Sequence, residues 1–344
     1  MRIGIHYLRP VASIAGIALF AYLLQRTDPK AILGDIRTLG WGVAVLILLS
    51  GLRHVLRALA WSYCIQTEGE SPAALELLGP RLIGEALNDL TPAGPLLGEP
   101  AKVVAVSRRI PTQAGASSIV LENLIYALGA FLFMLSGVAL AVVSVATLRG
   151  FRWIGGGLVI CFLTSMAIVY RTITRRVLLL GGIIDCLKRL GLRWGVLERH
   201  EQSVRAVEHN VYDFFLNRRR TFLAVLAIEI LTNFTGIGEA YLILKVTATH
   251  PSLFAAYLVE SASRAVQLGF SFVPLGLGVQ EGAAAATLQA VGYAAGVGIS
   301  LAVIRKIRTL FWAAVGLLVM TKYSIAWPGA EENSISYEAA HCQR

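Results

Sequence analysis

The sequence has few charged residues, which occupy only 15% of its 344 positions, whereas soluble globular chains carry about 25%. A soluble fold of this length needs roughly two domains with charged surfaces, so an ordinary soluble enzyme and a disordered chain are excluded. Cysteines are also scarce, and the four present (Cys64, Cys161, Cys186 and Cys342) form no Cys-x-x-Cys pair. Neither a disulfide framework nor a metal site is therefore indicated. Because 56% of the residues are hydrophobic, we expect an all-α integral membrane protein.

Positive charge is concentrated in one segment of the chain. There are 31 Lys and Arg against 21 Asp and Glu, and residues 171–220 alone hold eleven Lys and Arg against five Asp and Glu. A basic loop between apolar spans is expected on the cytoplasmic side of a membrane, and Arg2 and Arg9 place the N-terminus on the same side. The pattern favours contact of the 171–220 loop with anionic lipids and argues against nucleic acid as a partner.

Six segments are apolar and long enough to cross a membrane, which takes about 20 residues: 5–24, 41–63, 114–147, 153–170, 221–247 and 301–325. Two further stretches, 73–109 and 252–299, are apolar but interrupted by Pro, Gly and charged residues. The 171–220 loop returns to the cytoplasm only if 73–109 enters and leaves on one side, as a re-entrant hairpin does. We predict one transmembrane domain over 1–344, with halves at 1–170 and 221–344.

The basic loop also has a helical pattern. Val204, Val207, Val211 and Phe214 recur at the spacing of one helix face. This pattern predicts an amphipathic helix, which either lies on the cytoplasmic membrane face or packs on the bundle as a solvated connector.

The two interrupted stretches share the pattern Pro-x-Gly-x-x-x-x-Glu, 182 positions apart: Pro92, Gly94 and Glu99, then Pro274, Gly276 and Glu281. Together with Gly98, Gly278 and Gly282, these residues predict two helical hairpins. Broken helices at membrane depth need burial or a water-filled cavity, and two at corresponding positions indicate an inverted-repeat transporter. The alternative is a pair of kinked helices that pack closely through glycine. A membrane carboxylate costs about 2.5–3.5 kcal/mol on insertion scales, so its recurrence favours a functional site.

Further charges fall within the predicted spans. Arg53 and Arg57 share a helix face, where they either bind a lipid phosphate or snorkel to the interface. Glu229 and Glu239 are expected to form interhelical pairs. A basic group, Arg305, Lys306 and Arg308, would begin the last span from the outer side, against the positive-inside rule; the alternative is a position deep in the bundle, paired with carboxylates or an anionic ligand.

Two segments resemble the signatures of a known family. The first runs from Arg81 through Asn88-Asp89 to Pro92 and ends at Glu99; the second runs from Glu260 to Gly282 and is followed by Arg305-Lys-Ile-Arg308. Both are similar to the flippase-like membrane family, which includes the transmembrane region of lysylphosphatidylglycerol synthase. The amino-acid sequences of both segments are most similar to the hopanoid-biosynthesis-associated branch of this family. The family commonly has a second glycine before the first glutamate, so Leu97-Gly98-Glu99-Pro100 predicts a first hairpin that bends differently.

The resemblance implies about six full spans and two re-entrant hairpins in the bacterial cytoplasmic membrane. It further implies movement of a hopanoid or related polar lipid between leaflets or toward export. The headgroup would contact the polar signature residues and one arginine of the second span: Asn88, Glu99, Glu260, Arg264, Gln280, Glu281, Arg305 and Arg53. We expect Glu99 and Glu281 to pair with Arg264, Arg305 and Arg53 when no lipid is bound, and to exchange partners when lipid arrives.

The sequence shows no catalytic motif, so we predict no catalytic residue and no cofactor. The soluble aminoacyl-transfer domain of the synthase is not expected here. Two alternatives stay open. One is a membrane-embedded glycosyl or acyl transferase that uses Glu99 or Glu281 as a general base, and the other is a scaffold that assembles lipid-synthesis enzymes through the 171–220 loop.

Overall fold

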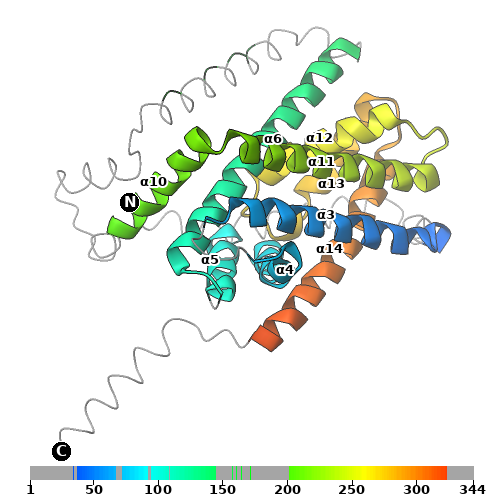
Figure 1. The fold of residues 1–344 in the computed structure, drawn as a ribbon. Coiled ribbons are helices and arrows are strands. Elements are labelled where there is room, and N and C mark those ends of the chain that lie inside the picture. The colour runs from blue at the N-terminus through cyan, green and yellow to red at the C-terminus, as the bar shows by residue number, and fades with distance from the viewer. Residues whose placement is uncertain are drawn as a thin grey trace, which may run out of the picture.

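The computed structural model describes residues 37–66, 72–91, 94–107, 109–144 and 201–323, with single residues at 34, 157, 160, 164 and 171. Over these ranges the fold is all-α, as predicted (Figure 1). The elements are α3 (Gly42–Cys64), α4 (Ala74–Leu90), α5 (Pro95–Val106), α6 (Thr112–Ser144), α10 (Glu201–Asn217), α11 (Arg219–Thr247), α12 (Leu253–Gly269), the 3-10 turn η2 (Pro274–Gly276), α13 (Val279–Ala290) and α14 (Ala295–Tyr323). The predicted span 5–24, all but three residues of the span 153–170, most of the 171–220 loop and Pro92 lie outside the described residues.

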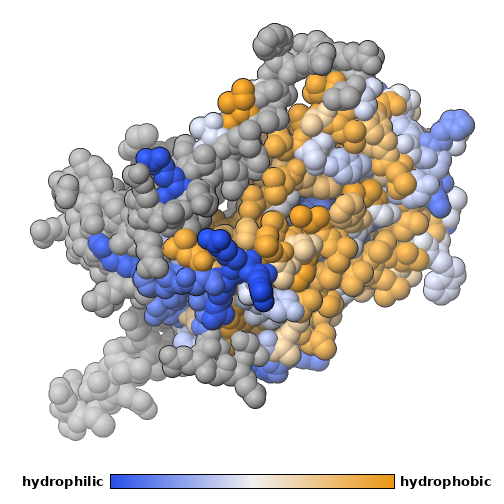
Figure 2. Space-filling view, turned by 45° about the horizontal axis from the view of Figure 1, so that its top comes forward, coloured by the Kyte–Doolittle hydropathy of each residue, from blue (hydrophilic) through white to orange (hydrophobic). Residues whose placement is uncertain are grey.

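Among the described residues, three helices are long and apolar enough to cross a membrane: Gly42–Cys64, Thr112–Val142 and Arg219–Thr247. They coincide with the predicted spans 41–63, 114–147 and 221–247. The predicted span 301–325 falls largely in α14, which is helical but is not among these three. The 29 residues of α11 rise about 43 Å, more than the roughly 30 Å of a hydrocarbon core. Large apolar side chains such as Leu48, Phe234 and Leu318 are exposed. Figure 2 shows hydrophobic residues over a broad part of one face, with hydrophilic ones toward its edges, which is the surface expected against lipid.

Both interrupted stretches form helical hairpins, α4 with α5 and α12 with α13; that they are re-entrant stays a prediction. The turns of the two hairpins differ from each other. The first turn passes through Gly94 at φ 28°, whereas the second contains η2 and positive φ at Leu275, Gly276 and Gly278. A Cβ on Gly94 would lie 3.1 Å from the Ser271 carbonyl oxygen of the other hairpin, so the first turn needs glycine for both conformation and space.

Two of the predicted hairpin glycines lie inside helices instead of in turns. Gly98 is in α5 and Gly282 is in α13. A Cβ on Gly98 would collide with the Asn88 side chain and the Gly84 carbonyl of α4. Gly98 therefore brings the two helices of the first hairpin together, which is the close packing that glycine permits.

The two halves pack reciprocally. Each has a long helix, a hairpin and a second long helix, in the order α3–α6 and α11–α14. Helix α3 packs on α11, α4 packs on α14, and α12 packs on α6, so each hairpin lies against the last helix of the other half. Leu46 shares a core cluster with Leu244, and Ala60 shares another with Val225, so α3 and α11 are antiparallel. Equivalent helices that run antiparallel are the arrangement of an inverted repeat.

Helix α10 packs on the bundle. Its Val211 and Phe214 are buried with Leu121 of α6 and Val225 of α11, and Val207 is partly buried. Val204 lies among the residues whose side chains are not described. Of the two arrangements predicted for this segment, the described side chains favour the connector packed on the bundle, because its apolar face is covered by protein.

Candidate functional site

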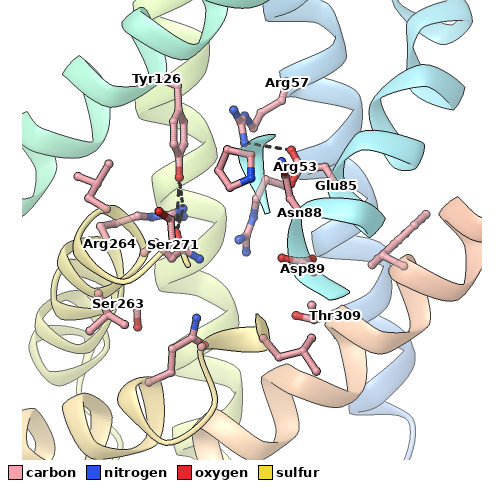
Figure 3. Close-up of a pocket in the computed structure, with 18 of the residues that line it drawn as sticks. Arg53, Arg57, Glu85, Asn88, Asp89, Tyr126, Ser263, Arg264, Ser271 and Thr309 are labelled. Atoms are coloured by element: carbon pink, nitrogen blue, oxygen red, sulfur yellow. Dashed lines mark hydrogen bonds and ion pairs between the residues drawn. The ribbon is translucent and has the colours of Figure 1, made fainter. Parts of the chain in front are cut away.

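A cavity of about 530 Å³ lies between the two hairpins, with α3 on one side and α14 on another (Figure 3). Its volume is within the range of small-molecule sites. Seven of the eight predicted headgroup residues line it: Arg53, Asn88, Glu99, Glu260, Arg264, Gln280 and Arg305. The eighth, Glu281, is buried behind the wall. Segments far apart in the sequence thus place the predicted residues around one space.

Cations predominate in the cavity wall. Eight Lys and Arg line it, against four Asp and Glu: Arg53, Arg57, Arg81, Lys102, Arg264, Arg305, Lys306 and Arg308, then Glu85, Asp89, Glu99 and Glu260. The balancing carboxylates, Glu122, Glu229, Glu239 and Glu281, are buried and do not line the cavity. The surface presented to a ligand is therefore cationic, although the surrounding protein supplies counter-charges.

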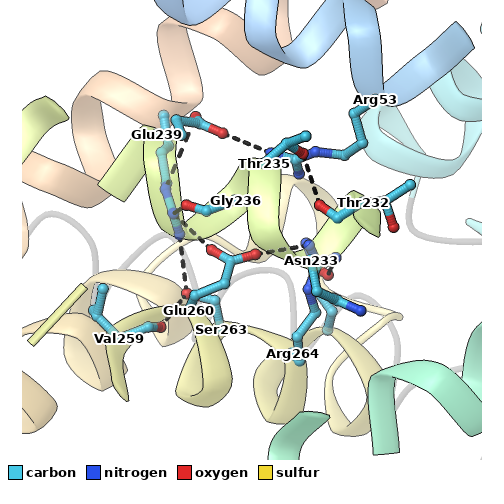
Figure 4. A network of polar contacts seen from close by, with 12 residues as sticks. Arg53, Thr232, Asn233, Thr235, Gly236, Glu239, Val259, Glu260, Ser263 and Arg264 are labelled. Atoms are coloured by element: carbon cyan, nitrogen blue, oxygen red, sulfur yellow. Dashed lines mark hydrogen bonds and ion pairs between the residues drawn. The ribbon is translucent and has the colours of Figure 1, made fainter. Parts of the chain in front are cut away.

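Glu260 is the centre of the network in the second half (Figure 4). Its two carboxylate oxygens accept hydrogen bonds from Arg264 at 2.7 Å and from Arg305 at 2.6 Å. Arg305 also donates to the Gly236 carbonyl oxygen at 3.1 Å. A Cβ on Gly236 would collide with the Glu260 carboxylate, so this glycine of α11 makes the space that the ion pair occupies.

Glu239 of α11 is the second centre. It accepts hydrogen bonds from Arg53 of α3 at 2.6 Å and from Arg308 of α14, and its side chain is fully buried. The basic group at residues 305–308 therefore lies deep in the bundle and is paired with carboxylates, which resolves its conflict with the positive-inside rule. Arg53 likewise pairs in the interior instead of snorkelling to the interface.

The first half has a corresponding centre at Glu122 of α6. This carboxylate accepts from Arg57 at 2.8 Å and from Arg81 at 3.1 Å, and Arg81 also pairs with Glu85 at 2.8 Å. Glu229 lies 3.7 Å from the Arg57 guanidinium. Both Glu229 and Glu239 thus form interhelical pairs, as predicted.

The Glu122 and Glu260 centres occupy equivalent places in the two halves, but the signs of the charges on their helices are exchanged. In the first half, Arg81 of the hairpin meets Glu122 of the following helix. In the second half, Glu260 of the hairpin meets Arg305 of the following helix. In both halves, one ion pair thus ties the first hairpin helix to the long helix that follows the hairpin.

The predicted partners of Glu99 and Glu281 are wrong. Glu99 pairs with Lys102 at 2.9 Å and accepts from the side-chain amides of Asn88 at 3.3 Å and Asn123 at 2.9 Å. Glu281 pairs with Lys306. Successive helix residues point about 100° apart, so Arg305 faces Glu260 on α12 while its neighbour Lys306 faces Glu281 on α13. The arginines are held by Glu260 and Glu239 instead.

Several residues that the structure brings to the site are not among the eight predicted headgroup residues, although Arg308 was expected to pair with carboxylates or an anionic ligand. Lys102, Asn123 and Arg308 belong to the site, and so do the paired residues Arg81 and Glu85. One available signal is the i, i+4 spacing of Arg81 with Glu85, which repeats at Glu260 with Arg264. No comparable signal marks Lys102, whose side chain fits only because Gly84 opposite it lacks a Cβ.

The wall has buried polar atoms that lack hydrogen-bond partners within the described structure. They include Nε of Arg53, Arg264 and Arg305, and Oδ1 of Asn88. An unsatisfied buried donor costs about 1–3 kcal/mol. Guanidinium groups match the oxygens of phosphates, so this arrangement can bind an oxygen-rich headgroup that supplies acceptors.

Comparisons with known proteins place the chain in a family. No curated protein and no solved structure matched it. The family described as the lysylphosphatidylglycerol synthase TM region matched residues 10–316, a range that contains both hairpins, the cavity and every residue of the charged networks. With apolar helices long enough to cross a bilayer, the chain is a membrane protein, and it belongs to the lysylphosphatidylglycerol synthase transmembrane-region family.

Proposed function

We propose that this protein moves a polar lipid between the leaflets of the bacterial cytoplasmic membrane, or toward export, by admitting the headgroup to the cavity. The observation that carries the proposal is a cationic cavity between two reciprocally packed hairpins, inside a bundle that is apolar over a broad part of one face (Figure 2). A lipid has the matching division between a polar head and apolar chains. The sequence resemblance makes a hopanoid or a related polar lipid the proposed cargo.

The headgroup would bind chiefly to the arginines of the second half. Arg264 and Arg305 reach the cavity from α12 and α14 while Glu260 holds both. Asn88 and Gln280 contribute amide groups from the two hairpins. Because the hairpins belong to opposite halves, a rocking motion of one half against the other would expose the same headgroup to either side in turn.

The transferase alternative has weaker support. Glu281 is fully buried and paired with Lys306, so a substrate proton cannot reach it in this arrangement. Glu99 already accepts from Lys102, Asn88 and Asn123. A general base must lie within reach of the proton that it removes. The burial of Glu281 prevents this, and the three hydrogen bonds to Glu99 occupy most of its capacity to accept. We therefore propose a transporter without enzymatic activity.

The proposal also concerns the side of the membrane on which the basic 171–220 segment lies and the lipids that it contacts. Arg218, which joins α10 to α11, and Arg219 and Arg220, which begin α11, are exposed at the end of the basic 171–220 segment. We propose that this end faces the cytoplasm and that its arginines contact anionic lipid headgroups, as the positive-inside rule implies.

The test is a leaflet-accessibility assay in proteoliposomes that contain a tracer of labelled hopanoid polyol or labelled phosphatidylglycerol. The wild-type protein is expected to expose inner-leaflet label to a membrane-impermeant quencher, and Arg264→Ala and Glu281→Ala are expected to slow this at least tenfold. Gln113→Ala, at an exposed position in the first turn of α6, serves as the control. Glu281 does not line the cavity, but its loss leaves the cavity-lining Lys306 without its counter-charge. Wild-type-like rates for both Arg264→Ala and Glu281→Ala would refute the headgroup site.

Arg218→Glu tests the scaffold alternative, which requires loss of function from this loop variant and none from Arg264→Ala or Glu281→Ala.

A further inference from the structure

Asp89 differs from every other carboxylate of the charged networks. It lines the cavity from the last turn of α4, and Figure 3 shows it near Thr309 of α14. The other seven, Glu85, Glu99, Glu122, Glu229, Glu239, Glu260 and Glu281, each lie within 4.0 Å of a Lys or Arg nitrogen. Within the described structure, the Asp89 side chain forms no ion pair and no hydrogen bond. It is only partly exposed.

The charge balance of the site depends on Asp89. Eight Lys and Arg line the cavity, and eight carboxylates line it or pair with those cations when Asp89 is counted. With Asp89 ionised, the formal charges cancel. With Asp89 protonated, one positive charge is left without a counter-charge. A carboxylate away from bulk water and without a partner is neutralised most readily by taking up a proton.

We propose that Asp89 is the proton-binding site of the transporter and that the cargo is a lipid with a monoanionic phosphate-ester headgroup, so that one proton and one headgroup move together. This inference rests on the proposed function. Protonated Asp89 leaves a site with one excess positive charge, which a phosphodiester neutralises. Loss of the proton on the other side restores the balance among the protein's own groups and releases the headgroup.

Other titratable and charged groups surround Asp89. The elements packed on α4 are α3, α5, α14 and η2, and α4 itself contributes neighbours. The charged and titratable cavity-lining residues of these elements are Arg81 and Glu85 (α4), Arg53, His54 and Arg57 (α3), Glu99 and Lys102 (α5), and Arg305, Lys306 and Arg308 (α14); η2 contributes none. His54 is the competing proton carrier, and its ring contacts that of Trp312, with the ring centroids 5.0 Å apart and the planes tilted by 59°. The experiment must therefore separate Asp89 from His54.

The experiment measures the distribution of tracer fluorescent phosphatidylglycerol between the leaflets of proteoliposomes under a gradient of about one pH unit. One-to-one movement of a proton with a monoanion predicts about tenfold accumulation in the leaflet facing the more alkaline solution, because each factor of ten in proton activity balances a factor of ten in lipid. The equilibrium ratio does not depend on how the protein is oriented in the vesicles. Protein-free vesicles and an ionophore that collapses the gradient should give equal leaflets.

Three variants test which residue binds the transported proton. Asp89→Asn is expected to abolish the accumulation, His54→Gln to keep the tenfold ratio, and the surface variant Asp213→Asn on α10 to behave as wild type. A tenfold ratio in Asp89→Asn, or its loss in His54→Gln alone, overturns the assignment. If Asp89→Asn moves no label, binding of short-chain phosphatidylglycerol to the purified variant is measured against pH: pH-independent binding supports the proposal, and the wild-type pH dependence contradicts it.

The outcomes also separate this inference from the proposed function. If the wild-type protein moves no lipid tracer, the proposed function fails. If it moves tracer but leaves the leaflets equal under the gradient, lipid translocation stands and proton coupling through Asp89 is wrong. Movement of the neutral hopanoid polyol with no movement of phosphatidylglycerol overturns the monoanionic cargo alone.

Discussion

Glu260 receives two guanidinium groups from two different helices, and both arginines are buried with it. Buried ion pairs are costly to desolvate, so they are weak evidence for stability, but removal of one partner leaves an uncompensated charge. The same holds for Glu122 with Arg57 and Arg81. At the scale of single residues, these glutamates therefore act as fixed anchors that keep the arginines in place around the cavity.

Glu260→Gln is expected to destabilise the protein by about 3–5 kcal/mol, because Arg264 and Arg305 lose their shared counter-charge. The matched control is Glu76→Gln, since Glu76 forms an exposed pair with Arg109 and surface pairs contribute about 0–1 kcal/mol. Unfolding of both variants in detergent, followed by intrinsic fluorescence, gives the comparison. Equal stability losses in the two variants would show that Glu260 is not a buried anchor. The double variant Glu260→Gln with Arg305→Gln should lose less than the sum of the single variants.

At the scale of elements, helix contacts depend on positions where a side chain has no room. Gly316 of α14 faces α4, where a Cβ would collide with the Leu82 carbonyl oxygen and approach the Ala86 side chain at 2.9 Å. Gly137 of α6 likewise faces α12, where a Cβ would collide with the Ser261 side chain. These are the two reciprocal contacts between a hairpin and the last helix of the other half, so small residues allow both halves to interlock.

Gly316→Ala is expected to cost about 1–3 kcal/mol through overpacking against α4. Gly238→Ala is the matched control in α11, because nothing lies within 4 Å of the added Cβ. Alanine should stabilise the helix there by roughly 0.5–1 kcal/mol. Thermal unfolding of the two purified variants should therefore shift in opposite directions. A shift of the same sign in both would mean that the α4–α14 contact does not limit stability.

The elements themselves were largely predictable. The spans 41–63, 114–147 and 221–247 were found from apolar length, because a lipid-facing helix must be apolar over its whole crossing. The hairpins were found from Pro and Gly at matched spacing. The partners of the charged residues were not predictable, since Arg305 and Lys306 are adjacent in sequence but face different helices. Which carboxylate each one meets depends on helix rotation and packing.

At the scale of the whole molecule, the antiparallel halves have a topological consequence. The α5–α6 connection and the α13–α14 connection occupy equivalent places in the two halves, so an inverted repeat puts them on opposite sides of the membrane. The start of α6 also lies near α10, where Asn210 donates to Ser117 at 3.2 Å. The end of α13 lies near the far end of α11, where Leu288 packs with Leu244.

In a background without native cysteines, Gln113→Cys and Gln289→Cys should react with an impermeant maleimide from opposite sides of the membrane. Both glutamines are exposed, at the start of α6 and the end of α13. Arg218→Cys should label from the same side as Gln113→Cys, and we expect that side to be the cytoplasm. Labelling of Gln113→Cys and Gln289→Cys from one side in intact cells contradicts the inverted arrangement.

By itself, the sequence determined the membrane class, the three described spans, the two hairpins and seven of the residues around the cavity. It did so because apolar length and Pro/Gly breaks are local properties that lipid imposes on a chain. The tertiary structure decided which charges pair and that Glu281 lies behind the cavity wall. It also decided that Asp89, alone among the eight carboxylates that line the cavity or pair with its cations, has no cationic partner. Those outcomes depend on the rotation and close approach of helices from opposite halves, which no local pattern specifies.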